Sequence, residues 1–402
     1  MSSVKRSKVD LVVDDEQTVA LHTGRPSVYL DQWVWSRLAA AARGRPRGRD
    51  DLDVLSIIRI ASAAGVVFPL SATHYIETTA VTEIAQRIAL SEVMAGVSHM
   101  RTLMSRHLLL RHQILSAMHV ALGRPTFRPL RVEALGTGVY WAFGGEVRAI
   151  TAQFPKELLD AGAKARPSEL LCRMTQWAEI QFLCGPRDED VEKLRRQYGY
   201  RPETAKESGA MRLEWEQIFG DLLEDDPVSR SELRVRIQAR ELIHEHLELL
   251  TELFDSYGMS INKAFGGSPG VVGSARPGLI KFGDSIPSLR IAVDMKADLF
   301  RDQQRTWKVN DLHDIDALSL AIPYCDVVVA DKAAVHSVHN AKADVRCGTK
   351  VAQNLSDLID LLPELIARAE LLGGDRTGWD WCSPGVGFNP LSPDMVEPGV
   401  LG

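Results

Sequence analysis

The sequence predicts an α/β fold, in which a parallel β-sheet covered by helices is interrupted by a long helical insertion. Two short segments, residues 27–30 and 327–330, are rich in β-branched, aromatic and aliphatic residues and have the composition of strands buried on both faces. A helix is predicted directly after each of them. Residues 91–286 carry long amphipathic helical patterns instead. The two observations together favour a sheet whose strands come from distant parts of the chain.

Composition places the chain among globular proteins. It has 402 residues, of which 45% are hydrophobic and 25% charged. The formal net charge of −6 argues against general coating of polyanions but allows a local basic groove. The five cysteines form no CxxC pair, which argues against a disulfide framework or a zinc ribbon and favours a reducing compartment. We find no signal-peptide pattern and no apolar run of about 18 residues, so we expect a soluble cytoplasmic protein without a membrane partner.

The predicted domain organisation is discontinuous. Residues 26–90 and 287–368 are expected to form one α/β domain, because strand and helix patterns alternate in both. Residues 91–286 form the all-α insertion. Residues 1–25 and 373–402 are expected to be tails, since the first is polar and the second is rich in Gly, Pro and Trp.

The elements of the α/β domain follow from periodicity and from Gly and Pro positions. In its first part we expect helices at 32–43, 53–64 and 72–96 and a strand at 66–70. In its second part we expect helices at 287–309, 315–322 and 355–372, a helix carrying His336 and His339, and a strand at 344–351. In the insertion we expect helices at 99–122, 167–183 and 230–257 and an irregular loop at 123–145.

Five acidic residues stand at comparable places in these elements. Asp31 and Asp331 each follow a predicted strand, and Glu77 lies two turns into the helix after the strand 66–70. Asp311 and Asp314 are three residues apart and share one face at the start of a helix. Each also has a plain interpretation, as an N-cap, as a partner of the helix dipole or as a solvated surface residue. If the strands are neighbours in one parallel sheet, the five carboxylates meet at its carboxyl edge.

Such a convergence points to metal-dependent chemistry. Several carboxylates packed together repel one another at neutral pH, and a divalent cation removes that repulsion. Oxygen ligands of this kind select Mg²⁺ or Mn²⁺. Two such ions stabilise the attacking and leaving oxygens in phosphodiester hydrolysis. The pattern therefore predicts hydrolysis of a phosphate ester.

The order of the acids resembles the PIN domain family of metal-dependent nucleases. An Asp after the first strand, a Glu early in a later helix, ND-x-x-D at 310–314 and a late strand that ends in Asp make the resemblance. Residues 323–332, PYCDVVVADK, are similar to the version found in a bacterial PIN-like branch. The resemblance covers 26–90 and 287–368 and leaves the large insertion unexplained. It implies a three-layer α/β/α fold with a parallel sheet.

The resemblance also implies a function and a site. Asp31, Glu77, Asp311, Asp314 and Asp331 would be catalytic, and all of them except Glu77 would bind Mg²⁺ or Mn²⁺. Glu77 would complete the site or orient the attacking water, and the choice between Asp311 and Asp314 as the main ligand stays open. The expected activity is that of an endoribonuclease, with DNA as an open alternative substrate. Many bacterial members of the family are toxins or defence nucleases, so an inhibitory protein partner is a further expectation.

Weaker candidates surround the acids. Arg43, Arg45 and Arg47 belong to a loop, RGRPRGR, that we expect beside the acidic site, where it would hold phosphates; the alternative is a solvated surface loop. His74 lies three residues before Glu77 and is a candidate substrate-binding neighbour.

A second hypothesis belongs to a different functional class. The chain would be a non-catalytic PIN-fold scaffold that binds nucleic acid or protein, and its acids would hold a structural ion or pair with arginines. The two hypotheses differ in geometry, because catalytic acids must meet in an open cleft.

Overall fold

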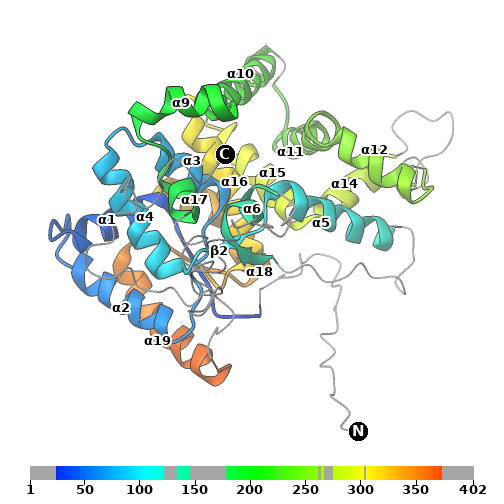
Figure 1. The fold of residues 1–402 in the computed structure, drawn as a ribbon. Helices are drawn as coiled ribbons and strands as arrows, with labels where there is room; N and C mark the ends of the chain where they lie inside the picture. Colours follow the sequence, from blue (N-terminus) through cyan, green and yellow to red (C-terminus); the bar gives the residue numbers. More distant parts are fainter. Residues whose placement is uncertain are drawn as a thin grey trace, which may run out of the picture.

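The computed structural model describes residues 24–121, 134–144, 178–225, 227–260, 264–266, 275–302 and 305–373. Helices surround a small parallel sheet (Figure 1). Its strands are β1 (Val28–Leu30), β4 (Val327–Val329) and β5 (Lys350–Ala352), in the order β1-β4-β5. Both pairs are parallel, and Val28 lies opposite Val327. The two strands predicted from their composition are therefore neighbours, which confirms the predicted parallel sheet.

Short pairings continue the sheet beyond β1. Ser27 and Val67 form a parallel bridge, and Leu70 forms another with Thr102 in β2 (Arg101–Leu103). Strand β2 pairs in antiparallel fashion with β3 (Leu135–Thr137). The strand predicted at 66–70 is thus reduced to two bridging residues. Pro69 explains this, because it has no backbone N–H to donate to a sheet.

Helices cover both faces of the sheet. Successive side chains along a strand point to opposite faces of the sheet. Val28 and Leu30 therefore lie on one face and Tyr29 on the other. The helices packed on the first face are α1 (Gln32–Ala42), α2 (Asp51–Ala63), α4 (Ile84–Ser98) and α19 (Leu355–Leu371). The helices packed on the second are α15 (Pro287–Leu299), α16 (Val309–Tyr324), α17 (Lys332–Asn340) and α18 (Ala343–Cys347). The result is an α/β arrangement with a large helical part.

The central region of the chain forms a helical body with a core of its own. Its core is built by α5 (Arg106–Ala121), α11 (Arg230–Arg240), the π-helix η1 (Glu241–Glu245), α12 (Leu247–Ser256) and α14 (Arg276–Asp284), with α10 (Glu203–Asp225) packed against it. The central region also contains α9 (Asp188–Tyr198) and α6 (Gly138–Phe143), and α6 packs on β2 and β3 instead. The rings of Phe254, Phe265 and Phe282 contact one another at inclined angles within the core of the helical body. Helices α5, α11, α12 and α14 lie together on one side of the molecule (Figure 1). Residues of α15 pack into this core and into that of the sheet, so α15 joins the two.

Several predicted helices are interrupted. The helix predicted at 72–96 is two helices, α3 (Ala72–Ala80) and α4, because Val81 is extended within a stretch of Thr and Val that disfavours helix. The helix predicted at 99–122 begins only at Arg106. His99 and Met100 have positive φ angles and lead the chain into β2 instead.

Other boundaries differ for similar local reasons. The helix predicted at 230–257 breaks at His246, whose φ of −126° ends the π-helix η1. Helix α15 ends at Leu299 rather than at 309, and the strand predicted at 344–351 is mostly the short helix α18 followed by β5.

Part of the predicted loop at 123–145 contains β3 and α6, where Gly138 starts the helix with a positive φ. Residues 1–23, 122–133 and 374–402, which include most of the predicted tails, lie outside the described residues, as does 167–177 of a predicted helix. Among the described helices, none combines the length and the apolar character needed to cross a bilayer.

Candidate functional site

Asp31 and Asp331 lie at the same edge of the sheet. Each follows a strand, β1 or β4, and each caps the helix that comes next. The Asp31 carboxylate accepts a hydrogen bond from the N–H of Gln32 at 2.6 Å, and that of Asp331 accepts one from the N–H of Ala334 at 2.8 Å. The backbone N–H of Asp31 donates to Val329 of the neighbouring strand at 2.9 Å. Parallel pairing of β1 with β4 therefore holds the two side chains next to each other.

Two helices bring further carboxylates to this edge. Helix α3 carries Glu77, and helix α16, which packs against α3, carries Asp314. The charges of Asp31, Asp331 and Glu77 all act on the Asp314 carboxyl, in this order of strength, and that of Asp311 acts more weakly. We call Asp31, Glu77, Asp314 and Asp331 the acid cluster. The predicted convergence of these four residues is present in the structure.

The acid cluster carries negative charge that its surroundings do not neutralise. Burial, and then repulsion from Glu77, raises the pKa of Asp31 to about 7. Burial, and then repulsion from Asp31 and Asp331, raises the pKa of Asp314 to about 8. Within the part of the chain that the structure describes, neither of these two carboxylates forms an ion pair. Protons or a cation must therefore compensate the cluster near neutral pH.

Asp311 has a different environment from Asp314. One of its oxygens lies 2.6 Å from the guanidinium of Arg305, and the other accepts a hydrogen bond from the backbone N–H of Lys308 at 2.8 Å. The residue is 8% exposed. Because its charge is already compensated, the structure places Asp314 at the centre of the cluster and Asp311 at its border.

His313 is a neighbour of the cluster that the sequence analysis did not single out. Its Nδ1 lies 3.4 Å from a carboxylate oxygen of Glu77, and its side chain is about one fifth exposed. The available signal was its position directly before Asp314 in NDLHDID. On a helix that one-residue offset turns His313 toward α3 while Asp314 faces the sheet edge.

His74 lies beneath the acid cluster and not at its surface. It is 1% exposed, its Nε2 donates to the carbonyl of Leu30 at 2.8 Å, and its Nδ1 accepts from the N–H of Ser71 at 2.9 Å. Burial lowers its pKa to about 4, so the ring is neutral. We therefore correct its expected substrate-binding role: with both nitrogens used by backbone groups, His74 positions β1 against α3 and holds Asp31 and Glu77 together.

Replacing His74 by Asn tests this structural role. The Asn oxygen can still accept from Ser71, but the carbonyl of Leu30 loses its donor. We expect His74→Asn to lower the free energy of unfolding by about 1–2 kcal/mol, because a buried carbonyl is left without a partner. Urea unfolding measures the change, and His336→Ala, at an exposed position of α17, is the control. Equal stabilities of the two variants would refute the role.

The arginine loop lies far from the acid cluster. Arg43, Arg45 and Arg47 follow the C-terminus of α1, whereas Asp31 caps its N-terminus. The helix of 11 residues in between is about 16 Å long. The loop is exposed, and Asp51 fixes it by accepting the backbone N–H groups of Arg47 and Gly48 at 2.8 Å. The prediction that these arginines lie beside the acids is therefore wrong, and they match the alternative of a surface loop.

A balanced ion network lies behind the cluster, where α16 meets the helical body. Asp316 binds two arginines, Arg106 at 2.8 Å and Arg212 at 2.6 Å, and is thereby excluded from the cluster. The other members of the ion network are Lys296, Arg240, Glu216, Glu241 and Glu245. The buried Lys296 lies 2.7 Å from Glu216 and also contacts Glu241. The network joins α5, α10, α11 and η1 to α15 and α16.

One group in this network has the spacing of metal ligands. In the described part of the chain, possible ligand atoms of Glu241, Glu245 and His246 lie within 4.8 Å of one another, whereas the carboxylates of the acid cluster are spaced more widely. Lys296 and Arg106 together offset the charges of both glutamates, and burial lowers the pKa of His246 to about 3. We therefore interpret the group as an ion-paired structural centre.

Known proteins add no further information about this site. Comparison of the chain with protein-family models, with curated proteins and with solved structures gave no match.

Proposed function

We propose that this protein is a nuclease that depends on Mg²⁺ or Mn²⁺ and cleaves RNA. The observation that supports the proposal is the convergence of four carboxylates at the carboxyl edge of a parallel sheet, two of which, Asp31 and Asp314, have raised pKa values and no ion-pair partner among the described residues. Asp31, Asp314 and Asp331 would hold the metal, since they supply the oxygen donors that these ions prefer. Wider spacing than that of a bound site is expected without a cation, because like charges repel.

The chain's own residues support phosphodiester hydrolysis in specific ways. A divalent cation bound at this site would supply activated water and compensation of the phosphate charge. Asp31 and Asp314 must lose their protons before they bind a cation, so metal affinity is expected to rise between about pH 6 and pH 9. Glu77 lies at the border of the cluster next to His313, where it is placed to orient a water molecule. Through its two hydrogen bonds, His74 fixes the position of Asp31 relative to Glu77.

Cleavage of a labelled single-stranded RNA pool tests the proposal. The protein is incubated with Mn²⁺, Mg²⁺ or EDTA, and a single-stranded DNA pool is run alongside. We expect metal-dependent cleavage of RNA that falls on the order of 10²–10³-fold in Asp31→Asn or Asp314→Asn, because each variant removes a charged group from the reacting centre. The exposed Asp360→Asn on α19 is the control and should leave the rate unchanged.

Asp311→Asn provides a sharper comparison within the same helix. It makes the same chemical change three residues from Asp314, at a carboxylate that Arg305 already neutralises. We expect it to reduce cleavage less than Asp314→Asn does. The reverse order would show that the metal-binding assignment is wrong, and a folded protein that cleaves neither pool with either metal would exclude the nuclease.

A further inference from the structure

A groove with an excess of positive charge lies beside the acid cluster. It consists of two adjoining hollows of about 580 and 180 Å³, and Asp298, Arg301 and Asn340 line both of them. Seven Lys and Arg side chains but three Asp side chains line the two hollows together. We call it the cationic groove. Its charge is opposite to that of the whole chain, which has a formal net charge of −6.

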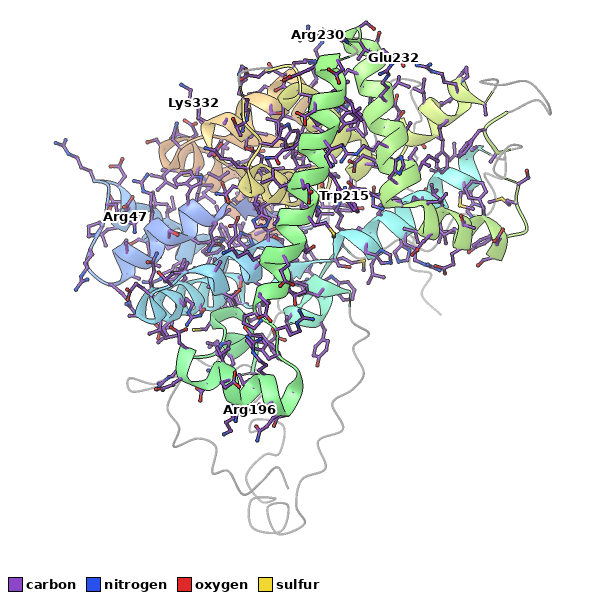
Figure 2. The ribbon with its side chains drawn as sticks, turned by 90° about the horizontal axis from the view of Figure 1, so that it is seen from above. Arg47, Arg196, Trp215, Arg230, Glu232 and Lys332 are labelled. Atoms are coloured by element: carbon purple, nitrogen blue, oxygen red, sulfur yellow. The ribbon has the colours of Figure 1, made fainter. Side chains whose placement is uncertain are left out.

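The larger hollow presents its cations to solvent. It is lined by Arg230 at the start of α11, by Arg301 and Arg305 between α15 and α16, and by Lys332 at the start of α17. Arg230, Arg301 and Lys332 are exposed, and Arg301 lies 3.8 Å from Asp298. Figure 2 shows Arg230 and Lys332 along one edge of the molecule, at the ends of two different helices. These cations are therefore available to a ligand.

The smaller hollow concentrates guanidinium groups around one carboxylate. Asp294 lies 2.7 Å from Arg234 and 2.7 Å from Arg346. Arg290 lines the same hollow, and burial together with the charges of Arg346 and Arg234 lowers its pKa. An anion in this hollow would lie beside three guanidinium groups, those of Arg234, Arg290 and Arg346.

One residue that lines the cationic groove is the chain neighbour of a member of the acid cluster. Lys332 is the residue directly after Asp331, and Arg305 in the same hollow pairs with Asp311. Arg230 and Arg234 come from α11 of the helical body, whereas Lys332 and Arg346 come from elements on the sheet. A ligand in the groove would therefore contact both parts of the chain and would reach the acid cluster at one end.

The geometry points to a binding site for the phosphate backbone of single-stranded nucleic acid. This inference rests on the proposed function for its direction, because it identifies the groove as the path that leads the substrate to the acids. Cations spread over several elements and two hollows match successive phosphates of a strand better than one small anion. Hollows of this size exclude a duplex, and most of the side chains lining them are charged, which favours contacts to phosphate over sequence readout.

Binding of labelled oligonucleotides in EDTA tests the inference without cleavage. Fluorescence anisotropy is measured with a single-stranded RNA, a single-stranded DNA of the same sequence and a duplex RNA, on Asp314→Asn and on variants made in that background. We expect the single strands to bind, with log Kd depending on log salt and a slope of about 0.7 per phosphate contact. The ratio of RNA to DNA affinity identifies which strand the groove prefers.

The decisive variant is the double charge reversal Arg301→Glu/Lys332→Glu. We expect it to weaken single-strand binding at least 10-fold at low salt and to reduce the salt slope, because two phosphate contacts become repulsive. The matched control is Arg45→Glu/Arg47→Glu, which makes the same change of net charge in the exposed loop beyond α1 and should change Kd less than about 2-fold. Thermal unfolding confirms that both variants remain folded.

Three results would overturn the inference. One is equal loss of binding in the groove variant and the loop variant, which would show an effect of net charge alone. Another is undiminished binding in the groove variant. The third is competition by inorganic pyrophosphate at the concentration at which the oligonucleotide itself competes, which would show a small-anion site. Strand binding without cleavage by the unsubstituted protein would instead refute the nuclease and leave the groove intact.

Discussion

Lys296→Met is expected to lower the free energy of unfolding by about 3–5 kcal/mol, because it removes a buried cation and leaves more carboxylates than cations in the ion network. Lys296 is fully buried and contacts Glu216 and Glu241. Burial alone would lower its pKa, but the glutamates outweigh burial and the pKa is raised. Methionine preserves the length and the apolar part of the side chain, so the loss reports on the charge. Urea unfolding measures the loss.

The control for this prediction is Lys332→Met, the same substitution at an exposed position in α17, where we expect a change within about 0.5 kcal/mol. A double variant, Lys296→Met/Glu241→Gln, should recover part of the loss, because the substitution at Glu241 removes one of the stranded charges. Destabilisation of Lys296→Met by less than 1 kcal/mol would show that solvent reaches the network. The same conclusion would follow if the double variant lost more stability than the two single variants lose in sum.

Asp314→Asn is expected to stabilise the metal-free protein at alkaline pH, in contrast to its effect on cleavage. The pKa of Asp314 is raised from 3.8 to about 8 by burial and then by Asp31 and Asp331. Between about pH 4 and pH 8 the folded state keeps a proton that the unfolded state has lost. The contribution of Asp314 to stability therefore falls as the pH rises through this window. Asn has no proton to lose and removes this fall.

The size of the stability difference follows from the pKa shift of Asp314. We reduce the expected value because the carboxyl is partly exposed to solvent. We expect Asp314→Asn to be more stable than the unsubstituted protein by about 2–3 kcal/mol at pH 9 in EDTA, and by almost nothing at pH 4. Thermal unfolding across this range measures it, with Asp360→Asn as the control. Millimolar Mg²⁺ or Mn²⁺ should remove or reverse the gain, since the cation stabilises only the intact cluster. A variant that is less stable at pH 9 in EDTA would show that the carboxylate is already compensated.

Local sequence determined the parts of the site that lie next to strands. A short strand that ends in Asp and is followed by a helix places a carboxylate at the strand end, where it also caps the helix. Asp31 and Asp331 were therefore predictable from a few residues each. Their meeting follows from parallel pairing of β1 and β4. The choice of Asp314 over Asp311 was not predictable, because it depends on the ion pair between Asp311 and Arg305, a residue outside any helix.

For the arginines of the loop after α1, closeness to Asp31 in the sequence does not mean closeness in space. Arg43 is 12 residues from Asp31, but a straight helix converts this short separation into a long distance. The cations that line the groove come from positions between 230 and 346 and from several elements, and no local pattern marks them as a group. The interruption of α11 by η1 has a related cause, since Glu241 and Glu245 turn toward Lys296 of a distant helix.

The pairing of β1 with β4 also determines when the acid cluster can form during synthesis. Ser27 at the start of one strand bonds Asp326 at the start of the other, 299 residues later in the chain. A nascent chain that ends before Asp314 contains Asp31 and Glu77 but lacks the middle strand of the sheet and the two remaining acids of the cluster. Such a chain has no complete centre with which to hold a metal. Under the proposed function, synthesis that stops early would therefore yield an inert product, and the helical body is already made when the last acids arrive.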